Sequence, residues 1–351
     1  MKRFFLLTCL LIMFLVMTIG IIAAGQEKIT IGFATRELTA PFSQAMVLAA
    51  QNKAKELGVE LVVLSSDNDS LRHLDIMDNF ITMGIDGFIC GGVIDTRAIV
   101  AGIKKMNEAN IPIVALDNSP EGGKIDYFIS NDIKDASKKA TEYMVQELKD
   151  KNEGKVPTGI IIEVLGDLTS SFAGECTAGF HSVIDNYKEF RIVQGTANWS
   201  NDESFKLVAD YLTRFGDEVI GIYVHTPDVM GTGAINAVKQ AGMDPKKIVS
   251  AGFCLGPEGI DLIKKGEFTA IGEQQIYTSG EMAVELLYKM IKGEPVPKIG
   301  DVLIEEGALW SPAEVIKNPL AEGAFIKLST PMIPQDVSPD DPRLWENMLF
   351  E

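Results

Sequence analysis

Short apolar runs alternate along the chain with longer stretches in which apolar residues recur every three to four positions. Runs of roughly four to eight residues have the length of strands, and the stretches between them have the spacing of helices that bury one face. The runs are mostly continuous rather than alternating, as expected of strands covered on both faces. They are Ile29–Ala34, Val59–Leu64, Gly87–Cys90, Pro112–Leu116, Gly159–Leu165, Arg191–Gln194, Ile220–Val224, Ile248–Phe253 and Thr269–Gly272.

Repeated strand–helix alternation predicts α/β architecture with parallel sheets and right-handed crossovers. Several of the expected helices are followed by a glycine suited to a C-terminal cap. These glycines are Gly58, Gly84, Gly242, Gly266 and Gly293.

The series of units starts twice. A polar segment with Gly and Pro, Asp150–Pro157, precedes the run Gly159–Leu165, and there are too many units for one small sheet. We therefore expect two similar lobes that face each other, with a ligand at the carboxyl ends of their strands. The last segment, Thr330–Glu351, is rich in Pro and Asp and is predicted to be irregular, held to a lobe surface by Leu344-Trp345 and Leu349-Phe350.

The N-terminus has the pattern of an export signal. Met1-Lys2-Arg3 is positive, residues 4–25 carry no charge, and the run closes with the small residues Ala23-Ala24-Gly25. This pattern predicts a signal peptide over residues 1–25 that is cleaved after Ala24 or Gly25. The alternative is an uncleaved membrane anchor, because the apolar run is long enough to span a bilayer.

Composition narrows the class of protein. The chain has 351 residues, of which 46% are hydrophobic, and that length favours two domains. A net charge of −17 argues against a nucleic-acid partner. After the signal, only Cys90, Cys176 and Cys254 remain, an odd number that forms no disulfide framework.

No catalytic signature is present. The chain lacks a phosphate loop and a nucleophile elbow, and Gly231-Thr-Gly lacks the third glycine of a dinucleotide loop. Cys176, Cys254 and His225 could gather as a soft metal site. Cysteine more often behaves as a small buried apolar residue, so we expect no metal. Because the catalytic and cofactor motifs are missing, we also expect no cofactor and no enzymatic activity.

Four side chains are candidates for a binding cleft. Arg36 follows the first strand directly; it could face a cleft or pair with Glu37 on the surface. Phe42 opens the next helix and could line the cleft or staple that helix into its lobe. Trp199 lies in a polar loop, which favours a binding role over a core role. Asp117 ends a buried strand and could contact ligand, cap a turn, or do both.

The order of these elements resembles the type 1 periplasmic binding proteins, more narrowly the ribose, rhamnose and autoinducer-2 receptors of bacterial ABC importers. The resemblance covers roughly residues 28–310. It is carried by Ile31-Gly-Phe with Pro41-Phe42, Gly84-Ile-Asp-Gly-Phe-Ile, Asn110–Asp117, Ala178-Gly-Phe180, Asp228 with Gly233-Ala234, Gly252-Phe253, and Gln274.

The resemblance implies two doubly wound parallel-sheet lobes joined by a three-segment hinge. The N-terminal lobe would comprise residues 28–130 plus 276–303 and the C-terminal lobe 131–275 plus 304–330, with 331–351 as a tail. The implied ligand-binding residues are Arg36, Phe42, Asp117, Asn118, Cys176, Trp199, Pro227, Asp228, Cys254 and Gln274. In this family aromatic rings cover the sugar face, while charged and amide groups take its hydroxyls.

Departures from the family pattern bear on the ligand. Asn118 and Cys176 stand where ribose receptors have arginines, and Cys254 stands where they have an aspartate, so D-ribose itself is in doubt. Arg36, Asp117 and the pair Pro227-Asp228 resemble the autoinducer-2 receptor more closely. That receptor's Asp-Gln pair on the second lobe, however, has no clear counterpart near Ser171–Glu175.

The resemblance implies an exported, monomeric receptor that captures a small sugar or polyol and delivers it to an ABC permease. It would work in the periplasm or at the cell exterior, or membrane-anchored if the signal is uncleaved. One alternative is an autoinducer-2-type signal receptor or a co-receptor for a chemoreceptor. A repressor-type sensing domain would need a DNA-binding helix-turn-helix before the first strand, where this chain has an export signal. An exported enzyme would need the missing catalytic groups.

Overall fold

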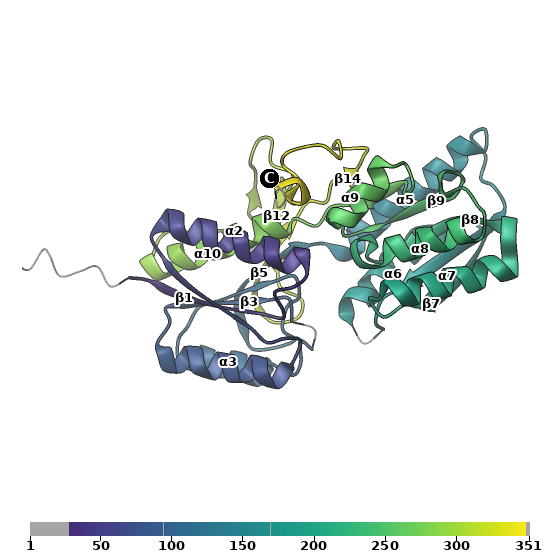
Figure 1. Cartoon of the computed structure of the whole chain (residues 1–351). Helices are drawn as coiled ribbons and strands as arrows, with labels where there is room; N and C mark the ends of the chain where they lie inside the picture. Colours follow the sequence, from purple (N-terminus) through teal and green to yellow (C-terminus); the bar gives the residue numbers. More distant parts are fainter. Residues whose placement is uncertain (1–27, 94, 169, 349–351) are drawn as a thin grey trace, which may run out of the picture.

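The protein consists of two α/β lobes that lie side by side, as seen in a computed structural model that describes residues 28–93, 95–168 and 170–348 (Figure 1). The expected signal sequence, residues 1–25, lies outside the described residues. Among the residues described, no helix combines the length and the apolar character that a membrane span requires. The predicted fold class, two parallel-sheet lobes, is confirmed.

The first lobe is an eight-stranded sheet in the order β11-β12-β13-β5-β4-β3-β1-β2. Helices α2 and α10 cover one face of this sheet, and α3 and α4 cover the other. Its strands are β1 (Thr30–Thr35), β2 (Glu60–Ser65), β3 (Gly87–Gly91), β4 (Ile113–Leu116), β5 (Lys124–Asn131), β11 (Val302–Leu303), β12 (Ala313–Lys317) and β13 (Glu322–Leu328). Its helices are α2 (Pro41–Leu57), α3 (Ser70–Met83), α4 (Val100–Glu108) and α10 (Ile276–Lys292).

The second lobe is a six-stranded sheet in the order β14-β10-β9-β8-β6-β7. Helices α5 and α6 pack on one face, and α7, α8 and α9 pack on the other. Its strands are β6 (Gly159–Leu165), β7 (Phe190–Thr196), β8 (Val219–Val224), β9 (Val249–Phe253), β10 (Ala270–Gly272) and β14 (Met332–Ile333). Its helices are α5 (Ile133–Lys151), α6 (Ser171–Ile184), α7 (Asn201–Phe215), α8 (Pro227–Gln240) and α9 (Gly256–Lys264), and the short α11 (Trp345–Met348) follows in the tail.

Both lobes repeat one strand order. In each, the first strand of the series lies between the second and the third, β1 between β2 and β3 and β6 between β7 and β8. The chain therefore reverses its winding direction beside β1 and β6, and a crevice opens there at the carboxyl ends of the strands. The predicted helix ends are also present, for example at Gly58 and Gly84, which adopt left-handed φ values of 68° and 70°.

The division of the chain between the lobes differs from the expected one after residue 303. Strands β12 and β13 fall in the range 304–330, which was expected in the C-terminal lobe, but they belong to the first sheet. The reason is that β13 pairs in parallel with β5 over six registered positions, from Glu322 with Lys124 to Leu328 with Asn131. The next segment returns to the second lobe, where β14 pairs antiparallel with β10.

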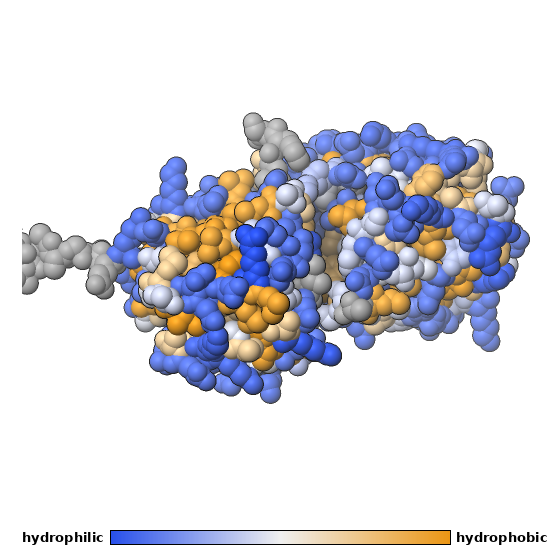
Figure 2. All heavy atoms as spheres, turned by 60° about the horizontal axis from the view of Figure 1, so that its bottom comes forward, coloured by the Kyte–Doolittle hydropathy of each residue, from blue (hydrophilic) through white to orange (hydrophobic). Residues whose placement is uncertain are grey.

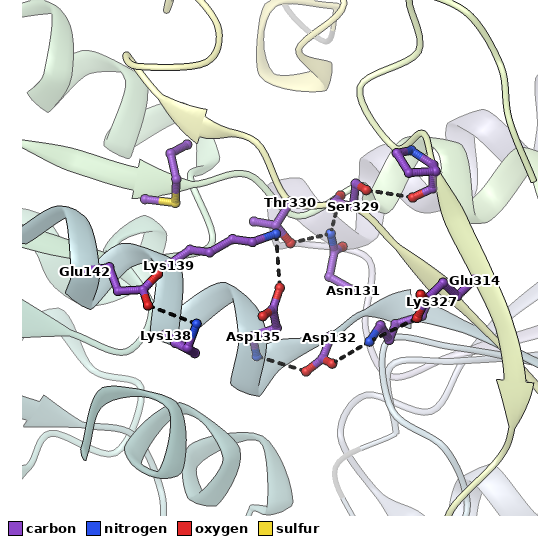
Figure 3. Close-up of polar contacts among 12 residues, drawn as sticks. Asn131, Asp132, Asp135, Lys138, Lys139, Glu142, Glu314, Lys327, Ser329 and Thr330 are labelled. Carbon is purple, nitrogen blue, oxygen red and sulfur yellow. Dashed lines mark hydrogen bonds and ion pairs between the residues drawn. The ribbon is translucent and has the colours of Figure 1, made fainter. Parts of the chain in front are cut away.

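Three crossings connect the lobes, near Asn131, Gln274 and Ser329. The Asn131 side chain makes hydrogen bonds to the other two crossings; Figure 3 shows those to Ser329 and Thr330. The Asn131 amide donates to the Ser329 carbonyl and to Thr330 Oγ1, both at 2.9 Å. Asn131 Oδ1 accepts from the Gln275 backbone amide at 3.0 Å. Beside it, the Lys327 ammonium lies 3.1 Å from Asp132 of the neighbouring crossing (Figure 3).

Candidate functional site

A cavity of about 410 Å³ lies between the lobes, where the carboxyl ends of the strands of both sheets meet. Figure 2 shows the two lobes as separate masses with a hollow between them. The loops after β1, β4, β8, β9 and β10 each contribute at least one lining side chain. The lining residues are Arg36, Glu37, Thr39, Ala40, Phe42, Asn68, Asp117, Asn118, Ser170, Phe172, Trp199, Thr226, Asp228, Val229, Cys254 and Gln274.

Arg36 lies in this cavity and is not paired with Glu37. Its guanidinium carbon lies 4.3 Å from the centroid of the Phe42 ring, a cation–π contact, and its Nε has no hydrogen-bond partner among the described residues. Because one face of Phe42 is covered by the guanidinium, a ligand that stacks on that face has to displace Arg36.

Glu37 instead builds the start of α2. Its carboxylate accepts hydrogen bonds from the backbone amides of Thr39 and Ala40 and from the Ser43 hydroxyl, the last at 2.6 Å. Burial opposes ionisation of Glu37, but the hydrogen bonds from Ser43, Thr39 and Ala40 outweigh it and lower its pKa. The two residues of the Arg36-Glu37 pair therefore have separate roles, one facing the cavity and one supporting Phe42's helix.

Asp117 is the buried carboxylate of the first lobe. Its backbone adopts a left-handed φ of 67°, which turns the chain sharply at the end of β4. Its Oδ1 accepts from Gln274 Nε2 at 2.8 Å, and its Oδ2 accepts from Asn118 Nδ2 at 3.3 Å. Burial raises the pKa of Asp117, although the Arg36 charge and the Gln274 hydrogen bond oppose the rise.

Asp228 is the facing carboxylate of the second lobe. It lies in the first turn of α8, and its Oδ1 has no hydrogen-bond partner among the described residues. Burial raises its pKa to about 7, against the lowering effects of a hydrogen bond from the Val229 amide and of the Arg36 charge. The neighbouring Thr226 hydroxyl is likewise buried without a partner among the described residues.

Aromatic side chains form the second-lobe wall. Trp199 lies in a loop with a left-handed φ of 57°, and its ring packs edge-on to Phe172 at 5.9 Å between centroids. Phe172 in turn stacks on Phe253 at 6.0 Å. The Trp199 ring lies directly over Gly166, where any side chain would collide with it. The cavity thus combines apolar ring surface with charged and amide groups, which suits a compact molecule with both C–H and hydroxyl faces.

Eight of the ten predicted residues line this cavity; Cys176 and Pro227 do not. Cys176 is fully buried in a small cluster with Phe172, Phe253 and Cys254, because α6 turns it away from the cavity. Pro227 begins α8, and its ring packs closely against Gly252.

The alternative of a soft metal site finds no support in the geometry. Among the described residues, no group of three or more metal-ligating side chains has suitable geometry. His225 lies in a buried pair with Glu163 at 3.1 Å, and the Cys254 thiol donates to Gln274 Oε1 at 3.4 Å.

Phe172 is the main lining residue that the sequence analysis missed. It is the second residue of α6, which follows the first strand of its lobe, and Phe42 is the second residue of α2, which follows β1. Comparing the two series of units position by position would have found it. Thr226, which lies between β8 and α8, is a further lining residue that the sequence analysis missed.

Residues 31–295 match the profile of a family described as the periplasmic binding protein domain. The ribose import binding protein of Haemophilus influenzae is 28% identical over 278 residues, covering 79% of this chain and 91% of that protein. The xylitol-binding protein of Mycolicibacterium smegmatis is 27% identical over 246 residues, covering 69% and 67%. A solved galactofuranose binding protein superposes with a TM-score of 0.70 at 19% identity, covering 87% of this chain and 94% of that one.

Proposed function

The chain belongs to the periplasmic binding protein domain family, and on that premise we propose that it captures a small sugar or sugar-like polyol outside the cytoplasm for an ABC importer. The observation that carries the proposal is the composition of the cavity. Side chains from both lobes surround it, and three buried polar atoms in it, on Arg36, Thr226 and Asp228, have no partner among the described residues. Buried polar groups of this kind need hydrogen bonds, and ligand hydroxyls would supply them.

The proposed roles follow from chemistry and position. Asp117 and Asp228, on opposite lobes, accept hydrogen bonds from ligand hydroxyls, and Arg36 donates to ligand oxygens. Asn118 and Gln274 orient Asp117, and Cys254 lies beside Gln274 at the floor. Phe42, Phe172 and Trp199 supply ring surface for the C–H face of the ligand. Relatives whose names state ribose import and xylitol binding support this class of ligand.

The same family membership supports the partners and compartment. We propose that the protein acts as a monomer without enzymatic activity, in the periplasm or at the cell exterior, and delivers its ligand to a membrane-bound ABC permease. We also propose that its closed form docks on a chemoreceptor.

A second candidate ligand is an autoinducer-2-type signal molecule. The observation that favours it is Arg36, a cation whose charge opposes the rise in pKa that burial causes both in Asp117 of its own lobe and in Asp228 of the facing lobe. A compact molecule with closely spaced oxygens could bind to all three groups at once.

A thermal-shift panel tests the ligand class. We would heat the purified protein with D-ribose, L-rhamnose, D-galactose, xylitol and autoinducer-2 in turn. A compound that binds only the folded state, present at a hundred times its Kd, adds about 2.7 kcal/mol to the free energy of unfolding. A clear rise in melting temperature with one member supports the proposal, and no rise with any member contradicts the proposed ligand class.

Two variants test the residues. We expect Asp117→Ala and Trp199→Ala to weaken binding of the active panel member at least about tenfold, because each removes a charged acceptor or a stacking ring. Calorimetry measures the affinities. Asp217→Ala, at an exposed aspartate far along the second lobe, is the control and should bind normally. Unchanged affinity in both test variants would rule out this cavity as the site.

A further inference from the structure

The C-terminal segment Pro331–Met348 lies beyond the part of the chain that matches the family profile, which ends at residue 295. It is not held to a single lobe surface. Leu344 is fully buried in the core of the second lobe, whereas its neighbour Trp345, 4% exposed, is buried in the core of the first lobe. The last described residues, in α11 (Trp345–Met348), therefore lie at the junction of the lobes (Figure 1). We call residues 331–348 the C-terminal strap.

Trp345 is connected to the cavity through one residue. Its indole Nε1 donates to the Gln274 backbone carbonyl at 3.1 Å, in a buried contact. The Gln274 side chain donates to Asp117 Oδ1 at 2.8 Å and accepts from the Cys254 thiol at 3.4 Å. The strap thus holds, from behind, the residue whose amide orients the buried carboxylate of the cavity.

Glu346 makes a second connection on the other wall. Its Oε1 accepts from the Gly256 backbone amide at 3.1 Å, where α9 begins. Gly256 lies so close to Asp228 that any side chain on it would collide with the Asp228 side chain. Glu346 is 3% exposed, and its Oε2 has no partner among the described residues. The buried Glu346 carboxyl thus contacts the turn at Gly256, against which the Asp228 side chain packs.

From these contacts we infer that Trp345 and Glu346 are positioning residues for the ligand cavity, Trp345 acting through Gln274 on Asp117 and Glu346 acting through Gly256 on Asp228. The inference rests on the proposed function, because it assigns their effect to sugar binding. Neither residue lines the cavity, so neither contacts ligand in this arrangement.

The first test removes one donor and keeps the ring. Trp345→Phe retains the buried aromatic side chain but removes the indole donor to the Gln274 carbonyl, which then keeps only the Ile276 backbone amide at 2.7 Å. We expect about threefold to tenfold weaker calorimetric binding of the active member of the five-compound panel, together with faster hydrogen exchange of the amides around Gln274 in sugar-free protein. Asp340→Asn, which weakens only the exposed strap ion pair with Lys264, is the control and should leave both readouts unchanged.

The second test uses a conservative pair. Glu346→Gln keeps an oxygen that can accept from Gly256, whereas Glu346→Ala does not. We expect Glu346→Gln to bind the panel compound as the natural protein does, and Glu346→Ala to bind it about threefold to tenfold more weakly. A merely structural role would lower the melting temperature of Trp345→Phe and Glu346→Ala without changing affinity or the exchange at Gln274, and that result would overturn the inference.

The two proposals fail in different ways. If no panel compound binds the natural protein, the proposed ligand class is wrong, while hydrogen exchange without sugar still decides whether the strap positions Gln274 and Gly256. If a compound binds and all strap variants bind it equally well, the proposed function stands and the strap inference is wrong.

Discussion

Arg36 shows how one residue can set the character of a binding site. It lies over Phe42, faces two carboxylates, and keeps a buried Nε without a partner among the described residues. The stack on Phe42 holds the guanidinium where a sugar ring would otherwise lie. If a ligand displaces the guanidinium from the Phe42 ring, the guanidinium can turn toward Asp117 or Asp228 and still donate hydrogen bonds to the ligand. We therefore expect Arg36 to determine which arrangement of ligand oxygens the cavity accepts.

We expect Asp228 to make ligand binding depend on pH. Its pKa is raised to about 7 by burial, and an ionised carboxylate accepts stronger hydrogen bonds than a protonated one. We expect affinity for the active panel compound to level off above pH 7 and to fall by up to about tenfold per pH unit below it. Calorimetry between pH 5.5 and 8.5 measures this. Asp228→Asn should bind more weakly and lose this dependence; the same pH slope in that variant would assign it to another group.

The same shift in Asp228 acts on stability with the opposite sign. The folded protein holds a proton that the unfolded chain releases above its ordinary pKa of 3.8. The contribution of Asp228 to the free energy of unfolding therefore falls as the pH rises from about 4 to 7.

Much of the cavity could be predicted from strand ends alone. Arg36, Asp117, Asp228 and Gln274 each follow a strand closely, and parallel strands bring such positions to one edge. Which face of a helix a residue occupies is harder to predict from sequence than which residues follow a strand. Cys176 is in α6, and its direction depends on the rotation of that helix against α5, which only packing determines.

At the scale of elements, the closest helix pairs depend on glycine. Gly179 of α6 lies against the Lys134 carbonyl of α5, Gly233 of α8 against the Asn201 carbonyl of α7, and Gly280 of α10 against the Met46 carbonyl of α2. At each position a methyl group would collide with the neighbouring backbone. Small residues at these points let the helices approach each other and hold the lobes' outer layers in register.

Two alanine substitutions in α6 separate packing from helix propensity. We expect Gly179→Ala to lower the free energy of unfolding by about 2 kcal/mol or more, because backbone atoms of α5 have to move. Gly174→Ala, at an exposed position of the same helix with no atom nearby, should raise it by about 0.5–1 kcal/mol. Urea unfolding of the sugar-free proteins measures both. Equal effects would show that the α5–α6 contact is not tight.

The strands that were predicted and those that were missed differ in their sequence patterns. All nine strand candidates are present within a few residues of their expected bounds, since continuous apolar runs indicate buried parallel strands. The strands β5 and β11 to β14 were not predicted. In β5, polar residues such as Asp126 interrupt the apolar run, and β11 and β14 are only two residues long. The lobe boundary after residue 303 depended on β13, and no local pattern shows which sheet an isolated strand joins.

On the scale of the whole molecule, three crossings gathered at Asn131 join the lobes, and we expect the lobes to bend about this junction. The side chains that line the cavity come from both lobes, so a ligand there would contact all of them only when the lobes approach. Binding should therefore shift the population toward closed arrangements.

Small-angle X-ray scattering tests this closure. We expect the radius of gyration to decrease when the active panel compound is added at saturating concentration, and to return when the compound is dialysed away. Trp199→Ala at the same compound concentration, below saturation for that variant, should contract less. An unchanged radius with calorimetrically bound sugar would show that the lobes do not close on it.

The positions of the tryptophans should allow intrinsic fluorescence to follow ligand binding and lobe movement separately. The chain contains three tryptophans. Trp199 lines the cavity, whereas Trp310 and Trp345 line a separate hollow behind the junction of the lobes. We therefore expect emission from Trp199 to respond to ligand in the cavity, and emission from Trp310 and Trp345 to respond to movement of the lobes. Two variants, Trp199→Phe and the double variant Trp310→Phe with Trp345→Phe, each measured at a saturating compound concentration, would separate the ligand signal from the lobe-movement signal without any attached dye.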